Sequence, residues 1–309
     1  MVIKLKFKIF SIICALVCIS CSTPQSLNNT GQMNTGTLCL SIPYGTATSE
    51  LGVIISGIEK EGPKSFFAQG DYFYILDSVK KRIAIFADGE FYRAVSINNC
   101  SYPLDLLVFQ ERFFVYDNPD QPTVYEIDLN GQILNQFAVT IPGHETKWLS
   151  LTRNNHVAVI DCNYNEYELD PPTNKFKKGK KGISTVFNNN AYWIQKTQDG
   201  KLHLLSLESS IDIPIESEGI TTGVEIIGYD LEGNIYVIAN DMANTSKVTG
   251  EFTARKFDRF GNPSGSAVIP ISDYYYMPVR MAQITPDGTV YLMVSGENSL
   301  EIRKLVLNK

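Results

Sequence analysis

A strand pattern that recurs six times along the chain constrains its fold more than any other feature. The first copy is YFYILD at residues 72–77, and every later copy keeps Ile, Val or Leu at the fourth position. The third position is a large aromatic residue in five of the six copies. The copies begin at residues 72, 112, 156, 191, 234 and 289. Repetition at this spacing indicates a solenoid, a propeller or a similar array.

Each copy is followed by a turn and a second strand. Turn dipeptides such as Asp88-Gly89 and Asn130-Gly131 separate the units. The second strands are expected at 82–87, 123–129, 166–170, 201–207, 252–258 and 299–307. Alternating or continuous runs of β-branched and aromatic residues dominate after residue 21, without a sustained helical period. This part of the chain is therefore expected to be all-β.

The size of the repeat and the two ends of the repeated region predict how the ring closes. Six copies across residues 38–307 give 45 residues per copy, which is the size of a four-stranded propeller blade. The last copy lacks a fourth strand, whereas Leu38–Ile42 is a strand without a blade of its own. Placed as the outer strand of the last blade, it removes an open edge. We predict a six-bladed β-propeller of four-stranded antiparallel blades over residues 38–309, closed by this N-terminal strand.

Residues 1–20 are typical of a secretory signal. Lys4, Lys6 and Lys8 precede an apolar stretch, Ile9–Ser20, which is shorter than the about 20 residues of a membrane-spanning helix. Ser20-Cys21 resembles the lipobox of bacterial lipoproteins, in which the cysteine is acylated and becomes the first residue. Cys18 stands where that pattern usually has Leu. A cleaved signal without a lipid is the alternative.

The lipobox resemblance implies a lipid such as palmitate on Cys21 and a tether over residues 21–37. That segment has no charged residue and few apolar ones, so it is expected to be flexible. The folded part is then expected outside the cytoplasm, held at the membrane of a bacterial cell envelope. Ser22 would favour the outer membrane in a Gram-negative host.

Charge and cysteine content restrict the partners and the covalent framework. The chain has a net charge of −6, and removal of the three signal lysines leaves 24 basic against 33 acidic residues, or −9. An acidic chain argues against nucleic acid as a partner and against electrostatic docking on anionic lipid. Beyond Cys21 only Cys39, Cys100 and Cys162 remain, and three cysteines cannot all pair. Disulfides are not the framework, although a Cys39–Cys100 bond stays open.

One stretch supports a family resemblance. Residues 77–86, DSVKKRIAIF, are similar to an NHL-type repeat, which has Asp, a few polar residues, Arg, and a strand ending in an aromatic residue. Lys80 and Lys81 stand where that family usually has Asn and a variable residue, and later copies lose the Arg. The chain thus resembles six-bladed NHL-like propeller lipoproteins of bacteria over residues 38–307. The resemblance implies a fold and no chemistry.

The usual catalytic motifs are mostly missing. The sequence has no GxSxG, HExxH, P-loop or GxGxxG motif, and three histidines are too few for a His-rich metal site or for histidine catalysis of the virginiamycin-lyase kind. Propellers of the lactonase type hold calcium or a similar ion at their axis, and that resemblance makes four residues candidate ligands: Asp117, Asp161, Asn163 and Asp241. However, Asp77, Asp117 and Asp161 share one repeat position, which favours turn capping. No other cofactor is expected.

The candidate binding residues lie in the connections that a propeller gathers on one face. These are the turns after the second strand of each blade and the connections between blades, and they contain most aromatic residues outside the expected strands. The candidates are Tyr102, Trp148, Tyr164, Tyr274, Tyr275 and Tyr276, with Arg280 as a partner for an anion or carboxylate. Exposed aromatic residues on loops of a rigid scaffold are typical of recognition surfaces. The alternative for Tyr274–Tyr276 is the start of a core strand.

These observations favour a binding protein over an enzyme. We expect a membrane-anchored, extracytoplasmic scaffold that recognises a protein, peptide or glycan through its loop-bearing face. A metal-dependent lactonase or hydrolase stays open as an alternative, as does an envelope-assembly component that uses the outer edges of its blades. The basic run at residues 177–181, KKGKK, is expected to be a solvated loop or a contact for an anionic polymer or headgroup.

Overall fold

The computed structural model describes residues 36–118, 120–141, 146–152, 154–170, 172–184, 191–197, 201–206, 211–215, 220–242, 250–269 and 274–308. All of them belong to one compact unit, Met33–Lys309. Over these ranges no helix has the length and apolar character needed to cross a membrane. The expected signal and the proposed lipid site Cys21 lie outside the described residues.

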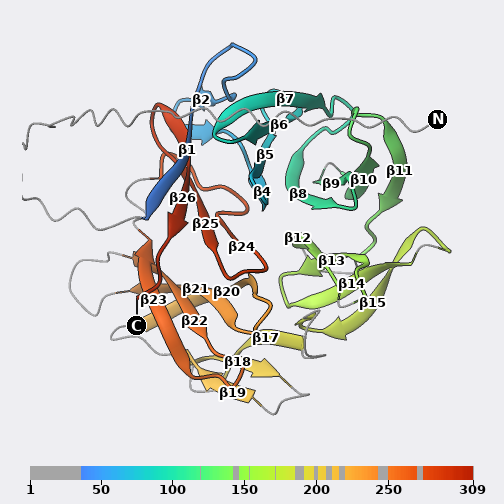
Figure 1. Cartoon of the computed structure of the whole chain (residues 1–309). Coiled ribbons are helices and arrows are strands. Elements are labelled where there is room, and N and C mark those ends of the chain that lie inside the picture. Colours follow the sequence, from blue (N-terminus) through green and yellow to red (C-terminus); the bar gives the residue numbers. More distant parts are fainter. Residues whose placement is uncertain are drawn as a thin grey trace, which may run out of the picture. The chain divides into compact units, whose positions relative to one another are not determined.

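The strands form six four-stranded antiparallel sheets, which are the blades of a propeller (Figure 1). The strands are given from the innermost outward. Blade 1 is β4 (Ser65–Gln69), β5 (Tyr72–Asp77), β6 (Arg82–Ala87) and β7 (Glu90–Ser96), and blade 2 is β8 (Pro103–Phe109), β9 (Arg112–Asp117), β10 (Thr123–Ile127) and β11 (Ile133–Ala138). Blade 3 is β12 (Thr146–Leu151), β13 (Val157–Asp161), β14 (Asn165–Asp170) and β15 (Lys175–Lys181). Blades 4 and 5 are β16 (Ile183–Ser184), β17 (Ala191–Lys196), β18 (Leu202–Ser206), β19 (Ile211–Pro214); and β20 (Ile220–Tyr229), β21 (Ile235–Met242), β22 (Gly250–Phe257), β23 (Pro263–Ile269). Blade 6 is β24 (Ala282–Ile284), β25 (Val290–Ser295), β26 (Ser299–Leu305) and β1 (Thr37–Pro43).

The ring closes as the sequence predicts. Strand β1 is the outermost strand of blade 6 and pairs antiparallel with β26, with Leu40 opposite Ile302 and Ile42 opposite Leu300 (Figure 1). Leu40 and Ile42 are buried, so the N-terminal strand also contributes to the core. The predicted fold class is therefore confirmed, including the closing strand.

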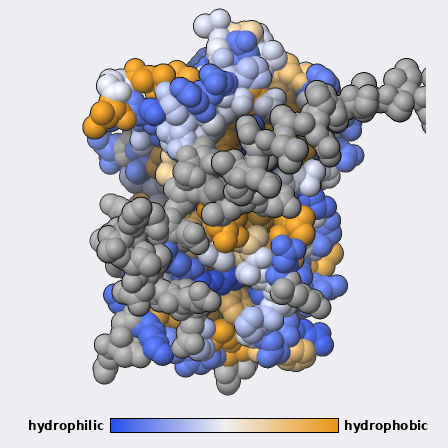
Figure 2. Space-filling view, turned by 90° about the vertical axis from the view of Figure 1, so that its left-hand side faces the viewer, coloured by the Kyte–Doolittle hydropathy of each residue, from blue (hydrophilic) through white to orange (hydrophobic). Residues whose placement is uncertain are grey.

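The hydrophobic core lies between neighbouring blades, whereas the outer surface mixes polar and apolar residues, as Figure 2 shows for one side of the protein. The repeated fourth position of the pattern falls on the second strand of each blade, and it is fully buried in five blades, at Ile75, Val115, Val159, Val237 and Leu292. Five buried clusters fill the interfaces between blades; one of them extends over blades 3, 4 and 5, and another joins blades 6 and 1. A single blade cannot bury both of its faces, so this packing around a ring is what stabilises each sheet.

The topology gathers two sets of connections on one side of the ring, which we call the loop face. Strands alternate in direction within a blade, so the turn between the second and third strands emerges on the same side as the connection to the next blade. The connection from β1 to β4 is unusual because it contains a small hairpin, β2 (Ile54–Ser56) and β3 (Glu59–Glu61), that forms a separate two-stranded sheet. The hairpin therefore belongs to the loop face.

Candidate binding site

The repeated aspartates hold the connections of the loop face in place. The Asp77 carboxylate accepts hydrogen bonds from the backbone N–H groups of Gly52 (3.2 Å) and Lys80 (3.3 Å). The Asp117 carboxylate accepts them from the backbone N–H groups of Ser101 (2.9 Å) and Tyr102 (2.5 Å). In both blades the carboxylate at the end of the second strand binds the backbone that enters the blade. The predicted turn capping is confirmed at Asp77, and Asp117 holds the connection that enters its blade.

Asp161, Asn163 and Asp241 also make local contacts. The Asp161 carboxylate accepts hydrogen bonds from the backbone N–H groups of Asn163 and Asn165, both at 2.8 Å. The Asp241 carboxylate forms an ion pair with Arg255.

The candidate metal ligands do not come together. They lie on three blades: Asp117 on blade 2, Asp161 and Asn163 on blade 3, and Asp241 on blade 5. In the described ranges no three His, Cys, Asp or Glu side chains form a group able to hold a metal ion. The divalent ion stays an untested prediction from resemblance, and the observed donors already engage the carboxylates proposed for it.

A cluster at the inner ends of the blades ties four blades together. Arg280 lies just before the inner strand of blade 6, and its guanidinium donates to both carboxylate oxygens of Asp105, at 2.9 Å and 2.5 Å. Asp105 belongs to blade 2, is fully buried, and also accepts hydrogen bonds from the Ser65 hydroxyl (2.6 Å) and the Leu149 N–H (2.7 Å). Arg280 donates further to the Leu149 carbonyl at 2.7 Å. We call these four residues the axial clamp.

The sequence predicted that Arg280 would be a partner for an anionic ligand. In the structure its guanidinium is already paired. Its guanidinium donors are directed at Asp105 and Leu149, and its side chain is 17% exposed. A bidentate pair of this kind neutralises the arginine and fixes its orientation. The prediction missed Asp105 because an acidic residue inside the apolar strand PLDLLVF has no visible partner in the sequence.

A second ion pair lies beside the clamp, between blades 3 and 5. The Lys147 ammonium is 3.6 Å from the Glu225 carboxylate. Desolvation among the inner strands raises the pKa of Glu225, and the positive charges of Lys147 and Arg280 oppose that shift. The Glu225 side chain keeps 36% of its surface exposed, so its carboxylate reaches water although the surrounding inner strands limit its solvation.

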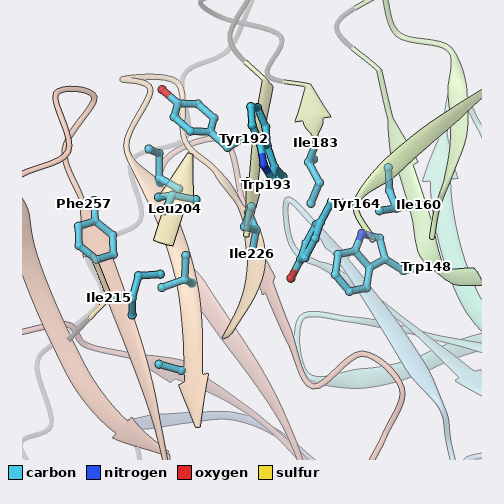
Figure 3. Close-up of a cluster of buried hydrophobic side chains, with 13 residues drawn as sticks. Trp148, Ile160, Tyr164, Ile183, Tyr192, Trp193, Leu204, Ile215, Ile226 and Phe257 are labelled. Carbon is cyan, nitrogen blue, oxygen red and sulfur yellow. The ribbon is translucent and has the colours of Figure 1, made fainter. Parts of the chain in front are cut away.

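Trp148 and Tyr164 are buried, contrary to the expectation that they are exposed on loops. Trp148 belongs to strand β12 and is 8% exposed, and the Tyr164 ring packs edge-on against it with a centroid separation of 6.2 Å. Figure 3 shows the two rings side by side within the cluster of blades 3, 4 and 5. The Tyr164 hydroxyl donates to the Val224 carbonyl of blade 5 at 3.0 Å. Burial raises the pKa of Tyr164.

Tyr164 has a backbone conformation that large residues rarely adopt. Its φ is +60°, in a turn where Asp161 accepts N–H bonds from residues two and four places later. The same Asp turn occurs at residues 230–234 and 258–262, where the corresponding position is Gly233 or Gly261. A tyrosine there is strained and must be held by its surroundings. Through its hydroxyl the Tyr164 side chain bridges from blade 3 to blade 5.

The three consecutive tyrosines have different environments. Tyr276 is buried, and its hydroxyl lies 3.4 Å from that of Tyr44. Burial raises the pKa of Tyr276 and raises that of Tyr44 to about 12. Tyr274 packs against the cluster between blades 5 and 6. Exposure was the wrong expectation for Tyr276, and the segment does not begin a core strand either, since β24 starts at Ala282.

The remaining candidates keep exposed surface on the loop face. Tyr102 is 43% exposed and Tyr275 is half-buried, and the apolar side chains of Met277 and Val279, which follow Tyr275 in the chain, reach solvent. We call these four residues the platform. Two lysines contact the platform. The Lys64 ammonium is 5.8 Å from the centre of the Tyr102 ring, and the Lys64 carbonyl accepts a hydrogen bond from the Val279 N–H at 2.7 Å. The Lys60 ammonium lies 3.5 Å from the centre of the Tyr275 ring.

The hairpin next to the platform escaped the sequence analysis altogether. Ile54 and Ile55 on β2 and Ile58 at the tip are all exposed. The signal that could have revealed it is the turn dipeptide Ser56-Gly57 between short β-branched runs.

The three cysteines of the described residues are free thiols: Cys39, Cys100 and Cys162. The Cys39–Cys100 bond that the sequence left open therefore does not form.

Comparisons with known proteins give no family. No protein-family model matches the chain, and no curated protein matches it. Among solved structures, Kuenenia stuttgartiensis hydrazine synthase is similar with a TM-score of 0.49 and 14% identity, covering 75% of this chain and 74% of that one. A catalytically inactive virginiamycin B lyase from Staphylococcus aureus, solved with quinupristin, has a TM-score of 0.46 and 10% identity, covering 79% and 95%. A Bacteroides caccae protein of unknown function has a TM-score of 0.41 and 12% identity, covering 67% and 81%. Similarities this low transfer no function.

Proposed function

We propose that this protein is a lipid-anchored, extracytoplasmic binding propeller that recognises a protein, peptide or glycan through its loop face. The observation that carries the proposal is the platform. Its four side chains, Tyr102, Tyr275, Met277 and Val279, gather on the loop face and retain exposed surface above a rigid ring. The lipid anchor is proposed on the Ser20-Cys21 pattern and the uncharged segment that follows it.

The platform residues are held by their backbones. Tyr102 N–H donates to the buried Asp117 carboxylate, Tyr275 N–H donates to the Ser295 carbonyl at 2.5 Å, and Val279 N–H donates to the Lys64 carbonyl. Positions fixed by backbone bonds leave the side chains available for a ligand at little cost in conformational entropy. Tyrosine combines a large apolar ring with a polar hydroxyl, which suits a partially hydrated contact with protein or sugar.

The topology leaves the loop face accessible in an anchored protein. Strand β1 leads from Thr37 to Pro43, and the chain then continues into the loop-face connection, so β1 starts at the opposite side of the ring. The segment between Cys21 and Thr37 could extend by roughly 50 Å at about 3.3 Å per residue. In this proposal a lipid on Cys21 holds the ring at the membrane while the platform stays free to meet a partner.

Site-directed crosslinking in intact cells tests the binding function. A photo-reactive residue replaces Met277 in the full-length chain, and the double substitution Tyr102→Ser/Tyr275→Ser is introduced in the same background. We expect an adduct at position 277 that the double substitution removes. The matched control is Tyr92→Ser, because Tyr92 is an exposed tyrosine on the outermost strand of blade 1. No adduct at position 277, or one that both sets of substitutions reduce equally, would refute the proposal.

The anchor is tested separately. Cys21→Ser should abolish incorporation of a fatty-acid analogue and release the protein from the membrane fraction. The neighbouring substitution Cys18→Ser should leave both unchanged. If Cys21→Ser retains the label, Cys21 is not the lipid site.

A further inference from the structure

The β2–β3 hairpin exposes apolar residues on all of its sides. Ile58 lies at the tip, beside Gly57 with a φ of +62°, and is 97% exposed. Such a two-residue turn, with glycine at its first position, projects the second residue away from the strands. Ile54 and Ile55 follow each other on β2, so their side chains point to opposite faces, and both are exposed.

The base of the hairpin is held firmly although its tip is not packed. Gly52, before β2, donates its N–H to the buried Asp77 carboxylate. Arg82, which pairs with Asp77, also donates to the Thr48 carbonyl at 2.6 Å and to the Glu50 carbonyl. After β3, the Gly62 carbonyl accepts from the Ser78 hydroxyl at 2.9 Å. The NHL-like stretch of blade 1 therefore fixes both ends of the hairpin.

A fixed base under an exposed tip is the arrangement expected of a docking element. The free protein gains little from these isoleucines, because their surfaces remain in water. The other tight turns of the repeats carry polar residues and glycine, as at Asp88-Gly89 and Asn130-Gly131. An apolar anchor that is already ordered before binding loses less entropy when it enters a pocket.

We propose that the hairpin inserts into an apolar cleft of a partner protein, and that the rim of this cleft is basic. The proposal rests on the proposed binding function and defines its partner more closely. Exposure of both faces of β2 and of the tip requires an occupant that encloses the hairpin, since a flat surface would cover one face. Glu59 is exposed directly beside Ile58, which calls for positive charge at the rim of the cleft next to the tip. Glu61 already pairs with Lys64 at 3.8 Å, and Lys60 lies over the Tyr275 ring, so Glu59 alone carries this part of the argument. The net charge of −6 and the exposed Glu59 disfavour an anionic lipid surface as the occupant.

The test uses the full-length chain in intact cells with a photo-reactive residue at position 58. The expected result is an adduct with a different polypeptide, whose yield falls at least about 10-fold in the Ile54→Ser/Ile55→Ser background. Glu59→Lys should reduce the yield as well, and Tyr92→Ser should not. The matched position is Leu134, an exposed leucine on the outer strand of blade 2, where no adduct is expected. Equal yields at positions 58 and 134, or insensitivity to the isoleucine substitutions, would overturn the proposal.

Further measurements separate the other occupants. The purified Cys21→Ser protein is mixed with vesicles of phosphatidylcholine, with and without phosphatidylglycerol, and no flotation is expected. Flotation that is lost in Ile58→Ser would replace the protein cleft by a lipid surface. An adduct with the mass of two copies of this chain would also overturn the proposal. Ile58→Ser should leave the melting temperature unchanged, because Ile58 is exposed in the free protein. A lower melting temperature would show that the tip contributes to the stability of the fold.

The outcomes of the two proposals differ. An adduct at position 277 without one at position 58 would preserve the binding function and refute the hairpin as its docking element. The absence of both adducts would refute the binding function itself.

Discussion

The axial clamp makes a quantitative prediction about stability. Replacing Asp105 with alanine leaves the Arg280 guanidinium without its carboxylate partner, and the Ser65 hydroxyl and the Leu149 N–H lose their acceptor. Asp105 is fully buried, and water replaces these contacts poorly. Removing one member of a buried ion pair costs about 3–5 kcal/mol, which is a large part of the 5–15 kcal/mol by which a domain is typically stable. We therefore expect the free energy of unfolding to fall by about 4 kcal/mol.

Urea unfolding followed by tryptophan fluorescence measures this change, since Trp148 lies in the blade 3 strand next to the clamp. With a slope of about 3 kcal/mol per molar urea, the midpoint should fall by roughly 1–2 M. Arg280→Met should cost less than Asp105→Ala, because Asp105 keeps its two other donors. In the double variant the two costs should not add, and the coupling energy should exceed about 1.5 kcal/mol.

The control for the clamp is Asp71→Ala. Asp71 is an exposed aspartate in the turn between β4 and β5, and its replacement should change stability by no more than about 0.5 kcal/mol. If Asp105→Ala behaves like Asp71→Ala, or if the effects of Asp105→Ala and Arg280→Met simply add, the clamp does not join the blades as described.

Three further predictions concern single side chains. Tyr164→Ala should lower the free energy of unfolding by about 3–5 kcal/mol, and Tyr164→Gly should be the milder change by about 1 kcal/mol because glycine accepts the φ of +60°; equal losses in urea unfolding would show that the turn is not strained. The pKa of Glu225 is raised on folding, so the folded state retains a proton that the unfolded state releases near pH 4.3. The contribution of Glu225 to stability should therefore fall as the pH rises from about 4.3 to its folded pKa. Glu225→Gln should remove that pH dependence from the urea midpoints, and an unchanged pH dependence would contradict the assignment. Burial raises the pKa of the Cys100 thiol to about 12, so iodoacetamide should modify Cys39 and Cys162 in the native protein and Cys100 after unfolding in urea; rapid labelling of native Cys100 would count against the core around it.

The sequence predicts the fold well because the fold is repeated. The alternation that places Ile75, Val115 and Leu292 in the core does so in five of the six blades, so each copy supports the interpretation of the others. The closing strand also follows from a count of strands, since Leu40 and Ile42 had no blade of their own. The capping aspartates were predictable from their common repeat position.

The binding site is predicted less well because it depends on contacts between blades. Trp148, Tyr164 and Tyr276 have the composition of a recognition surface, and the structure places all three in the core. Burial of Tyr164 depends on the Trp148 ring and on the Val224 carbonyl of blade 5, and nothing near residue 164 in the sequence shows the contact with residue 224. Arg280 and Asp105 are 175 residues apart, so their pairing appears only once the ring is assembled.

The basic run at residues 177–181 is solvated, as expected, but it is part of a strand and not a loop. It belongs to β15 (Lys175–Lys181), the outermost strand of blade 3, where Lys177, Lys178 and Lys181 are exposed. Lys177 pairs there with Asp170 of the adjacent strand. Lysines along an open edge discourage pairing with a strand of another molecule, which is a sufficient structural reason for the run.

The closing strand has a mechanical consequence. In an anchored protein the chain between lipid and ring enters at Thr37, the first residue of β1, so any pull between the membrane and a bound partner reaches the ring at the pairing of β1 with β26. That pairing also joins the first strand of the ring to the last, so it cannot form until β26 is available. In the exported and anchored protein that we propose, the seam that completes the propeller would be the last part of the ring to assemble and the first to bear load.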